Sequence, residues 1–175
     1  TENQGTSHQD ICGAYTDSAA AQARGLRVEQ ESWAFSGHSL LQDVIVLTYR
    51  VRNESAVSMA DLYAGVFLDL DVALSYDNTG GTNDGLNLVH LTAEGGPYVG
   101  LQLLQNVVGI SPPRSNLTLI SNPDYVYPNA YVPEADKYGF LSAADPQYVM
   151  PVTPEPNDYS VLVAAGPFTL APGAE

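Results

Sequence analysis

Carboxylate and amide side chains gather in one short stretch of the chain, and these groups bind hard cations. Asp69 and Asp71 end an apolar run, and further acidic and amide residues follow in a glycine-rich segment. Side chains two residues apart in a strand share a face, so we expect Asp69 and Asp71 to point the same way. Two adjacent carboxylates repel each other, and Ca²⁺, which accepts oxygen ligands in irregular geometry, relieves that repulsion. The predicted calcium ligands are Asp69, Asp71, Asp77, Asn78, Asn83 and Asp84.

The same stretch also suits a solvated acidic turn, because Asp, Asn and Gly are the ordinary turn residues. The ligand spacing of an EF-hand loop is absent from it. Both interpretations therefore stay open on the sequence.

We expect no catalytic centre. Ser39 begins a Gly-x-Ser-x-Gly pattern, but Leu41 replaces the last glycine and no strand–turn–helix context surrounds it. Asp69 and Asp71 lie too close together, in environments too alike, to divide the acid and base roles of glycoside hydrolysis. Metal-ligand spacing is missing among the three histidines, which are His8, His38 and His90.

Composition limits the partners. The 175 residues suit one domain, with 45% hydrophobic and only 15% charged residues. A net charge of −14 opposes binding to nucleic acid and suits a soluble, cation-binding or exported protein. The longest apolar runs are too short for a membrane helix, so no membrane insertion is expected. Cys12 is the single cysteine, which excludes an internal disulfide.

Short alternating segments predict an all-β fold. We expect an antiparallel β-sandwich, jelly-roll or immunoglobulin-like, over residues 25–175, preceded by an extended N-terminal arm at residues 1–24. The run 62–71 is apolar on both faces and is therefore expected to be a central strand. The other predicted strands are 26–35, 43–52, 86–91, 98–104, 117–120 and 159–165, and a helical turn is expected at 134–137.

Long loops rich in proline and tyrosine interrupt the strands. Residues 110–158 hold nine of the twelve prolines. Tyrosine is common in sugar-binding platforms and protein interfaces, so a glycan ligand is possible, and the alternative is that the rings cover the core. Asn53 and Asn116 begin glycosylation patterns whose use the sequence leaves open. The tyrosines concerned are Tyr125, Tyr127, Tyr131, Tyr138 and Tyr148.

Segments 25–35, 43–53, 62–71, 97–104 and 165–173 resemble, in the same order, the non-catalytic β-sandwich domains that follow the catalytic domain in large secreted bacterial subtilisin-like (S8) proteases and related surface proteins. The protease domain itself has no counterpart here, so the resemblance implies no protease activity. It does imply one more apolar strand after the turn at 165–173. Either the chain is trimmed, or a neighbouring subunit fills the groove, with residues 1–23 as the available donor strand.

These observations predict a non-enzymatic, extracellular, calcium-binding β-sandwich domain with an adhesive or structural role on a larger surface protein. The first alternative is a subunit that assembles with itself into a filament, tube or layer by strand exchange. The second is a carbohydrate-binding module.

Overall fold

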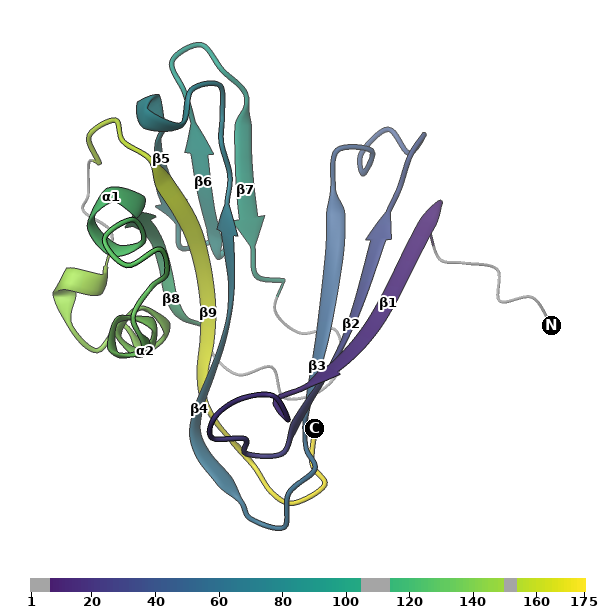
Figure 1. Cartoon of the computed structure of the whole chain (residues 1–175). Helices are drawn as coiled ribbons and strands as arrows, with labels where there is room; N and C mark the ends of the chain where they lie inside the picture. Colours follow the sequence, from purple (N-terminus) through teal and green to yellow (C-terminus); the bar gives the residue numbers. More distant parts are fainter. Residues whose placement is uncertain (1–6, 105–113, 150–153) are drawn as a thin grey trace. The chain divides into compact units, whose positions relative to one another are not determined.

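The computed structural model describes residues 7–104, 114–149 and 154–175 (Figure 1). The chain is mostly β and divides into two compact units. The first unit contains Thr1–Ala60 with Thr169–Glu175, and the second contains Asp61–Phe168. No helix in the described ranges is long and apolar enough to cross a membrane. The predominance of strands over helices confirms the expectation of a β-rich fold.

A three-stranded antiparallel sheet forms the first unit. Its strand order is β1-β2-β3, and the expected strands at 26–35 and 43–52 correspond to β2 and β3. Residues in register share a face, so Val28 and Val51 lie with Tyr15 on an apolar face, while Glu29 and Arg50 lie on the opposite face. The strands are β1 (Gln9–Thr16), β2 (Leu26–Ala34) and β3 (Ile45–Asn53).

The N-terminal segment differs from the expected free arm. Residues 9–16 pair with β2 along their whole length as β1, although their apolar alternation is weak. Backbone pairing needs no particular side chain, so a polar segment can add to an existing edge. Residues 9–16 are thus paired within the chain itself rather than free, while the donor role expected for residues 1–23 stays a prediction. Residues 1–6 lie outside the described part.

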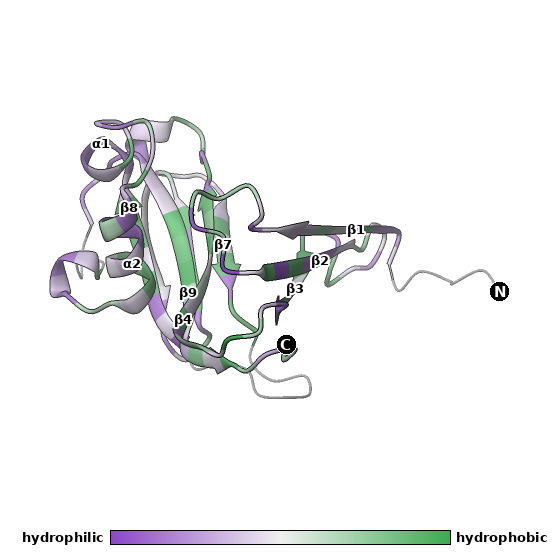
Figure 2. Cartoon of the chain, turned by 60° about the horizontal axis from the view of Figure 1, so that its bottom comes forward, coloured by the Kyte–Doolittle hydropathy of each residue, from purple (hydrophilic) through white to green (hydrophobic). Residues whose placement is uncertain are grey.

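Two sheets make the body of the second unit. The first has the order β4-β9-β8, so β9 is its central strand. The prediction of a central strand at 62–71 is wrong, because β4 lies at the end of this order, and its apolar residues are only partly buried. Figure 2 shows β9 as strongly apolar over much of its length. The strands are β4 (Met59–Asp69), β8 (Arg114–Ser121) and β9 (Tyr159–Leu170).

The second sheet contains the expected strands at 86–91 and 98–104 as β6 and β7, which pair as an antiparallel hairpin. Its third strand, β5, lies within the segment that was expected to be a turn. Gly80 permits this pairing, because a side chain there would collide with the backbone carbonyl of His90. The strands are β5 (Thr79–Asn83), β6 (Leu88–Thr92) and β7 (Tyr98–Gln102), and a 3-10 turn, η1 (Ser75–Asp77), precedes them.

The sheet that contains β8 and β9 is covered on both faces. On one face, Val161 and Leu119 pack with Val89 and Leu91 of the β5-β6-β7 sheet. On the other face, Leu162 and Ile120 pack with Phe140 beneath the helices, which lie beside β8 and β9 in Figure 1. The expected helical turn at 134–137 extends into a nine-residue helix. The helical elements are α1 (Asn122–Tyr125), α2 (Glu134–Ser142) and η2 (Pro146–Tyr148).

Two of the five loop tyrosines are packing residues. Tyr125 and Tyr148 each lie with their ring centroid 4.9 Å from that of Phe140, in edge-to-face geometry. Tyr138 makes a similar contact with Tyr63. The interpretation that these rings cover the core therefore holds for Tyr125 and Tyr148. Residues 105–113 and 150–153 of the proline-rich region lie outside the described part.

Candidate functional site

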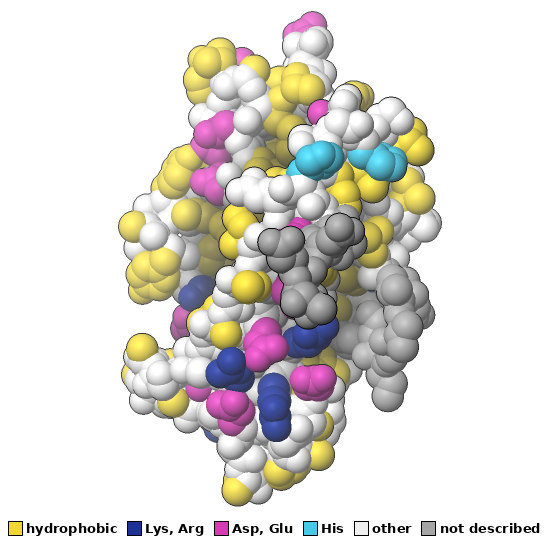
Figure 3. Space-filling model, turned by 90° about the vertical axis from the view of Figure 1, so that its right-hand side faces the viewer, with side chains coloured by type: hydrophobic (Ala, Val, Ile, Leu, Met, Phe, Trp, Pro, Cys, Tyr) yellow, Lys and Arg dark blue, Asp and Glu magenta, His cyan; other side chains and the backbone are white. Residues whose placement is uncertain are grey.

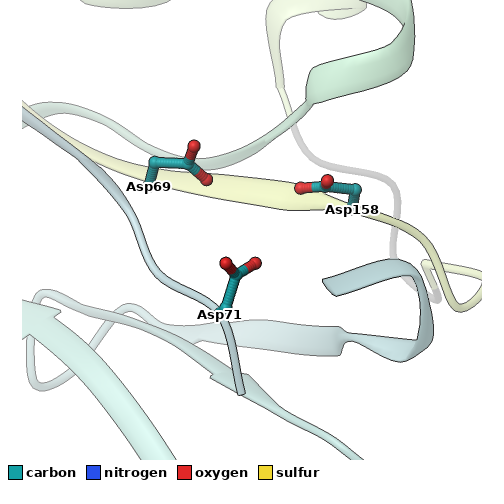
Figure 4. Close-up of side chains that lie close together, drawn as sticks. All are labelled: Asp69, Asp71 and Asp158. Carbon is teal, nitrogen blue, oxygen red and sulfur yellow. The ribbon is translucent and has the colours of Figure 1, made fainter. Parts of the chain in front are cut away.

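Three carboxylates meet at one end of the β4-β9-β8 sheet. Asp69 is the last residue of β4, Asp71 follows it, and Asp158 directly precedes β9. One oxygen from each residue lies within 4.8 Å of an oxygen of each of the others. Figure 4 shows the three side chains converging. β8 and β9 are antiparallel, and β4 and β9 run in opposite directions in Figure 1, so the end of β4, the start of β9 and the end of β8 come together.

Asn122 connects two of these carboxylates. It begins α1 directly after β8 and is fully buried. Its Nδ2 donates to Oδ1 of Asp69 at 3.0 Å and to Oδ1 of Asp158 at 2.6 Å. Its Oδ1 accepts from the Ser160 hydroxyl at 2.7 Å, and this hydroxyl also lies 3.3 Å from Oδ1 of Asp69. Asn122 and Ser160 thus fix the positions of the carboxylates.

Tyr127 donates its hydroxyl hydrogen to Oδ2 of Asp158. This hydrogen bond is the main reason that the pKa of Tyr127 rises to about 12, and desolvation and the charges of Asp158, Asp69 and Asp71 add to the shift. The phenol therefore stays protonated and acts as a donor at neutral pH.

The negative charge of the three aspartates has no ion-pair partner among residues 7–104, 114–149 and 154–175. The ion pairs among the described residues include none of the three aspartates. Asp158 is only 8% exposed, so water screens its charge poorly, while Asp69 and Asp71 are exposed. A cation at the centre of the cluster would balance this charge.

The spacing of the oxygens fits calcium. Ca²⁺ binds oxygen at about 2.3–2.6 Å, so two ligands of one ion lie at most about 5 Å apart. The oxygens of Asp69, Asp71 and Asp158 satisfy this limit, at 4.8 Å or less. Three carboxylates supply up to six oxygens, and the exposed side of Asp71 leaves room for water ligands.

Two of the other predicted ligands, Asn78 and Asp77, are not among the three clustered carboxylates. Asn78 is 1% exposed, and its side chain is bound locally: Oδ1 accepts from the Val72 amide at 3.0 Å, and Nδ2 donates to the Leu74 carbonyl at 2.6 Å. It therefore stabilises the loop after β4. Asp77 is exposed in η1.

Asn83 and Asp84 also have local structural roles. Asn83 Oδ1 accepts from the Leu86 amide at 3.1 Å in the turn between β5 and β6. Asp84 forms an ion pair with Arg114 at 2.9 Å. Of the six predicted ligands, the cluster of three carboxylates contains only Asp69 and Asp71.

Sequence reasoning missed Asp158, Asn122, Ser160 and Tyr127. Asp158 does carry a local signal, since Asn157 and Asp158 directly precede a predicted strand. That signal could not place Asp158 beside Asp69, because the two residues are 89 positions apart and only the strand order brings them together.

Both glycosylation patterns have a buried asparagine. Asn53 is fully buried, and its Nδ2 donates to the carbonyls of Val57 and Leu170 at 2.8 and 3.0 Å. Asn116 is 5% exposed and donates to the Phe140 carbonyl at 2.7 Å. A glycan on either nitrogen would break these hydrogen bonds, so the structure disfavours glycosylation at both positions.

No protein-family model matches the chain, and neither a curated protein nor a solved structure does. The functional argument therefore depends on the geometry of the site.

Proposed function

We propose that this chain is a non-enzymatic, calcium-binding β-domain, with Asp69, Asp71 and Asp158 as the ligands. The observation that carries this proposal is the convergence of three carboxylates within 4.8 Å, without a basic partner among the described residues. A bound ion would connect the end of β4 to the start of β9. Through Asn122 it would also hold the start of α1, so its role is to stabilise the fold.

The proposed location is extracellular, on a larger surface protein in which the domain has a structural or adhesive role. Three carboxylates with two exposed members form an open site, and open sites of this kind suit the Kd of roughly 10⁻⁴–10⁻³ M of extracellular calcium modules. The acidic, sparingly charged composition supports the same proposal. In this proposal the sheets form a β-sandwich like that of the protease-associated domains that the sequence resembles.

The alternative is a closed polar cluster that needs no metal. Asn122, Ser160 and Tyr127 already donate hydrogen bonds to two of the carboxylates, and such donors stabilise negative charge. Asp71 distinguishes the two cases, because no hydrogen bond to its side chain is present among the described residues, so its only role in the proposal is as a metal ligand.

Thermal unfolding with EDTA and with added Ca²⁺ tests the proposal. The expected stabilisation is about 2.7 kcal/mol when free calcium is about a hundredfold above Kd. Asp71→Asn should lose most of this stabilisation. Asp77→Asn is the matched control, because Asp77 is exposed and lies outside the cluster. An unchanged melting temperature of the unmodified chain in the two conditions would reject calcium binding and leave the closed polar cluster.

A further inference from the structure

The C-terminal segment pairs with the outer edge of β3. The Gly173 amide donates to the Asn53 carbonyl at 2.8 Å, and the Asn53 amide donates to the Ala174 carbonyl at 2.9 Å. Gly173 has a φ of +76°, and the Ala174 amide donates to the Ala171 carbonyl at 3.0 Å. A glycine of positive φ with this bonding pattern forms a G1 bulge, which belongs to antiparallel pairs. The C-terminal segment is therefore antiparallel to β3 where it pairs with Asn53.

Beyond Asn53 this edge is open. The Glu54 amide donates to the Gly25 carbonyl at 2.8 Å, so the even-numbered residues of β3 direct their amides and carbonyls toward β2. The odd-numbered residues consequently direct theirs outward. β3 is the last strand in its sheet, and no backbone group within the described ranges pairs with these outward groups. The residues concerned are Ile45, Leu47, Tyr49 and Val51.

The side chains along this edge define what could pair with it. Ile45 and Tyr49 are 69% and 37% exposed, and both lie on the apolar face of the sheet. A partner strand therefore gains most from apolar residues on that face, since residues directly opposite each other share a face.

The charged face adds a second requirement. Arg27 forms an ion pair with Glu29 at 3.1 Å, and Arg50 forms one with Glu31 at 3.9 Å. Arg52 lies directly opposite Arg27 and belongs to no ion pair among the described residues. Figure 3 shows basic side chains beside acidic ones on the face that it displays. A carboxylate on the partner, beside Arg52, would balance the unpaired charge.

We propose that the open edge of β3 binds an extended strand of another polypeptide, antiparallel to β3. The partner alternates apolar residues, which lie on the apolar face, with polar ones, and carries an acidic residue beside Arg52. This mode is β-strand addition, in which backbone hydrogen bonds give affinity and alternate side chains give specificity. It is independent of the proposed calcium site, because every residue used belongs to the first unit.

A pair of modified peptides tests the backbone geometry. The probe is a synthetic peptide of about eight alternating valine and threonine residues with one glutamate. The outward amides and carbonyls of β3 belong to residues on its apolar face. Because two residues of a hydrogen-bonded pair share a face, the valines of the peptide, which lie on that same apolar face, would form the backbone hydrogen bonds to β3. N-methylation of the valines should weaken binding roughly tenfold or more, whereas N-methylation of the threonines should leave it nearly unchanged. Fluorescence anisotropy of the labelled peptides, in EDTA, gives the affinities.

Charge reversal tests the specificity. Arg52→Glu should weaken binding of the acidic peptide and strengthen binding of the same peptide with lysine in place of glutamate. Lys137→Glu makes the same change of charge in the second unit and should do neither. Absence of binding, or equal weakening by both methylation patterns, would overturn the proposal. Sedimentation that shows the chain already self-associated, with the peptide unable to compete, would also overturn it in favour of a second copy at this edge.

Discussion

Asn122→Ala removes the side chain that links the two segments of the candidate site. The amide group bonds Asp69, Asp158 and Ser160, and alanine can make none of these bonds. The backbone bond from the Asn122 amide to the Asp158 carbonyl, at 2.9 Å, is unaffected by the substitution. The change therefore isolates the contribution of the side chain.

The expected loss follows from the burial of each partner. Asp158 is 8% exposed and loses a bond to a charged group, which costs about 2–3 kcal/mol. The fully buried Ser160 hydroxyl loses its acceptor on Asn122, which costs about 1 kcal/mol more. Asp69 is exposed, so water replaces most of its lost bond. We expect the free energy of unfolding to fall by about 3–4 kcal/mol in total.

Urea unfolding in EDTA measures this loss without a contribution from metal. Asn129→Ala is the matched control, because Asn129 is exposed and has no side-chain hydrogen bond among the described residues. Its substitution should change the free energy of unfolding by less than about 0.5 kcal/mol. A loss below about 1 kcal/mol for Asn122→Ala would refute the reasoning, because a buried polar cluster cannot lose its shared partner at so small a cost.

Two further substitutions test other parts of the fold. Gly139→Ala should lower the melting temperature, because the added methyl would collide with the Tyr148 ring. The same change in a helix without such a neighbour normally stabilises by about 1 kcal/mol. A raised melting temperature would therefore contradict the packing of Tyr148 against Gly139. Tyr127→Phe should remove the component of the tyrosinate absorbance titration near pH 12, because the pKa of Tyr127 is raised to about 12. The sign follows from a folded-state pKa above the ordinary 10: the stabilising bond to Asp158 is fully present below about pH 10 and is lost as pH rises through 12. If the absorbance component that Tyr127→Phe removes titrates near pH 10 instead, the hydrogen bond from Tyr127 to Asp158 is absent in solution.

Strands could be predicted where alternation is local and strong. The pattern at 26–35 and 43–52 gave β2 and β3, because one face of that sheet is apolar and the other charged. The run 62–71 was misjudged, because apolar residues on both faces indicate contact on both sides but not the number of strand neighbours. Residues 9–16 gave no signal, since an added edge strand needs only its backbone.

The candidate site could be predicted only in part, because the sequence does not show which strands are neighbours in a sheet. Asp69 and Asp71 come together through the two-residue repeat of a strand, which sequence shows directly. Asp158 directly precedes β9, the neighbour of β4 in the sheet, and a contact across 89 positions depends on that strand order. Asn78 suits a ligand by type, but the turns after β4 bind its side chain. Residue type thus indicated the chemistry, and topology determined which residues meet.

Calorimetric titration of Ca²⁺ into the metal-free chain tests the central claim most directly. We predict binding at a single site in the unmodified chain and in Asp77→Asn, with a Kd of roughly 10⁻⁴–10⁻³ M, and no measurable heat of binding in Asp71→Asn. Equal binding by Asp71→Asn, or none by the unmodified chain, would contradict the assignment of Asp69, Asp71 and Asp158 as calcium ligands.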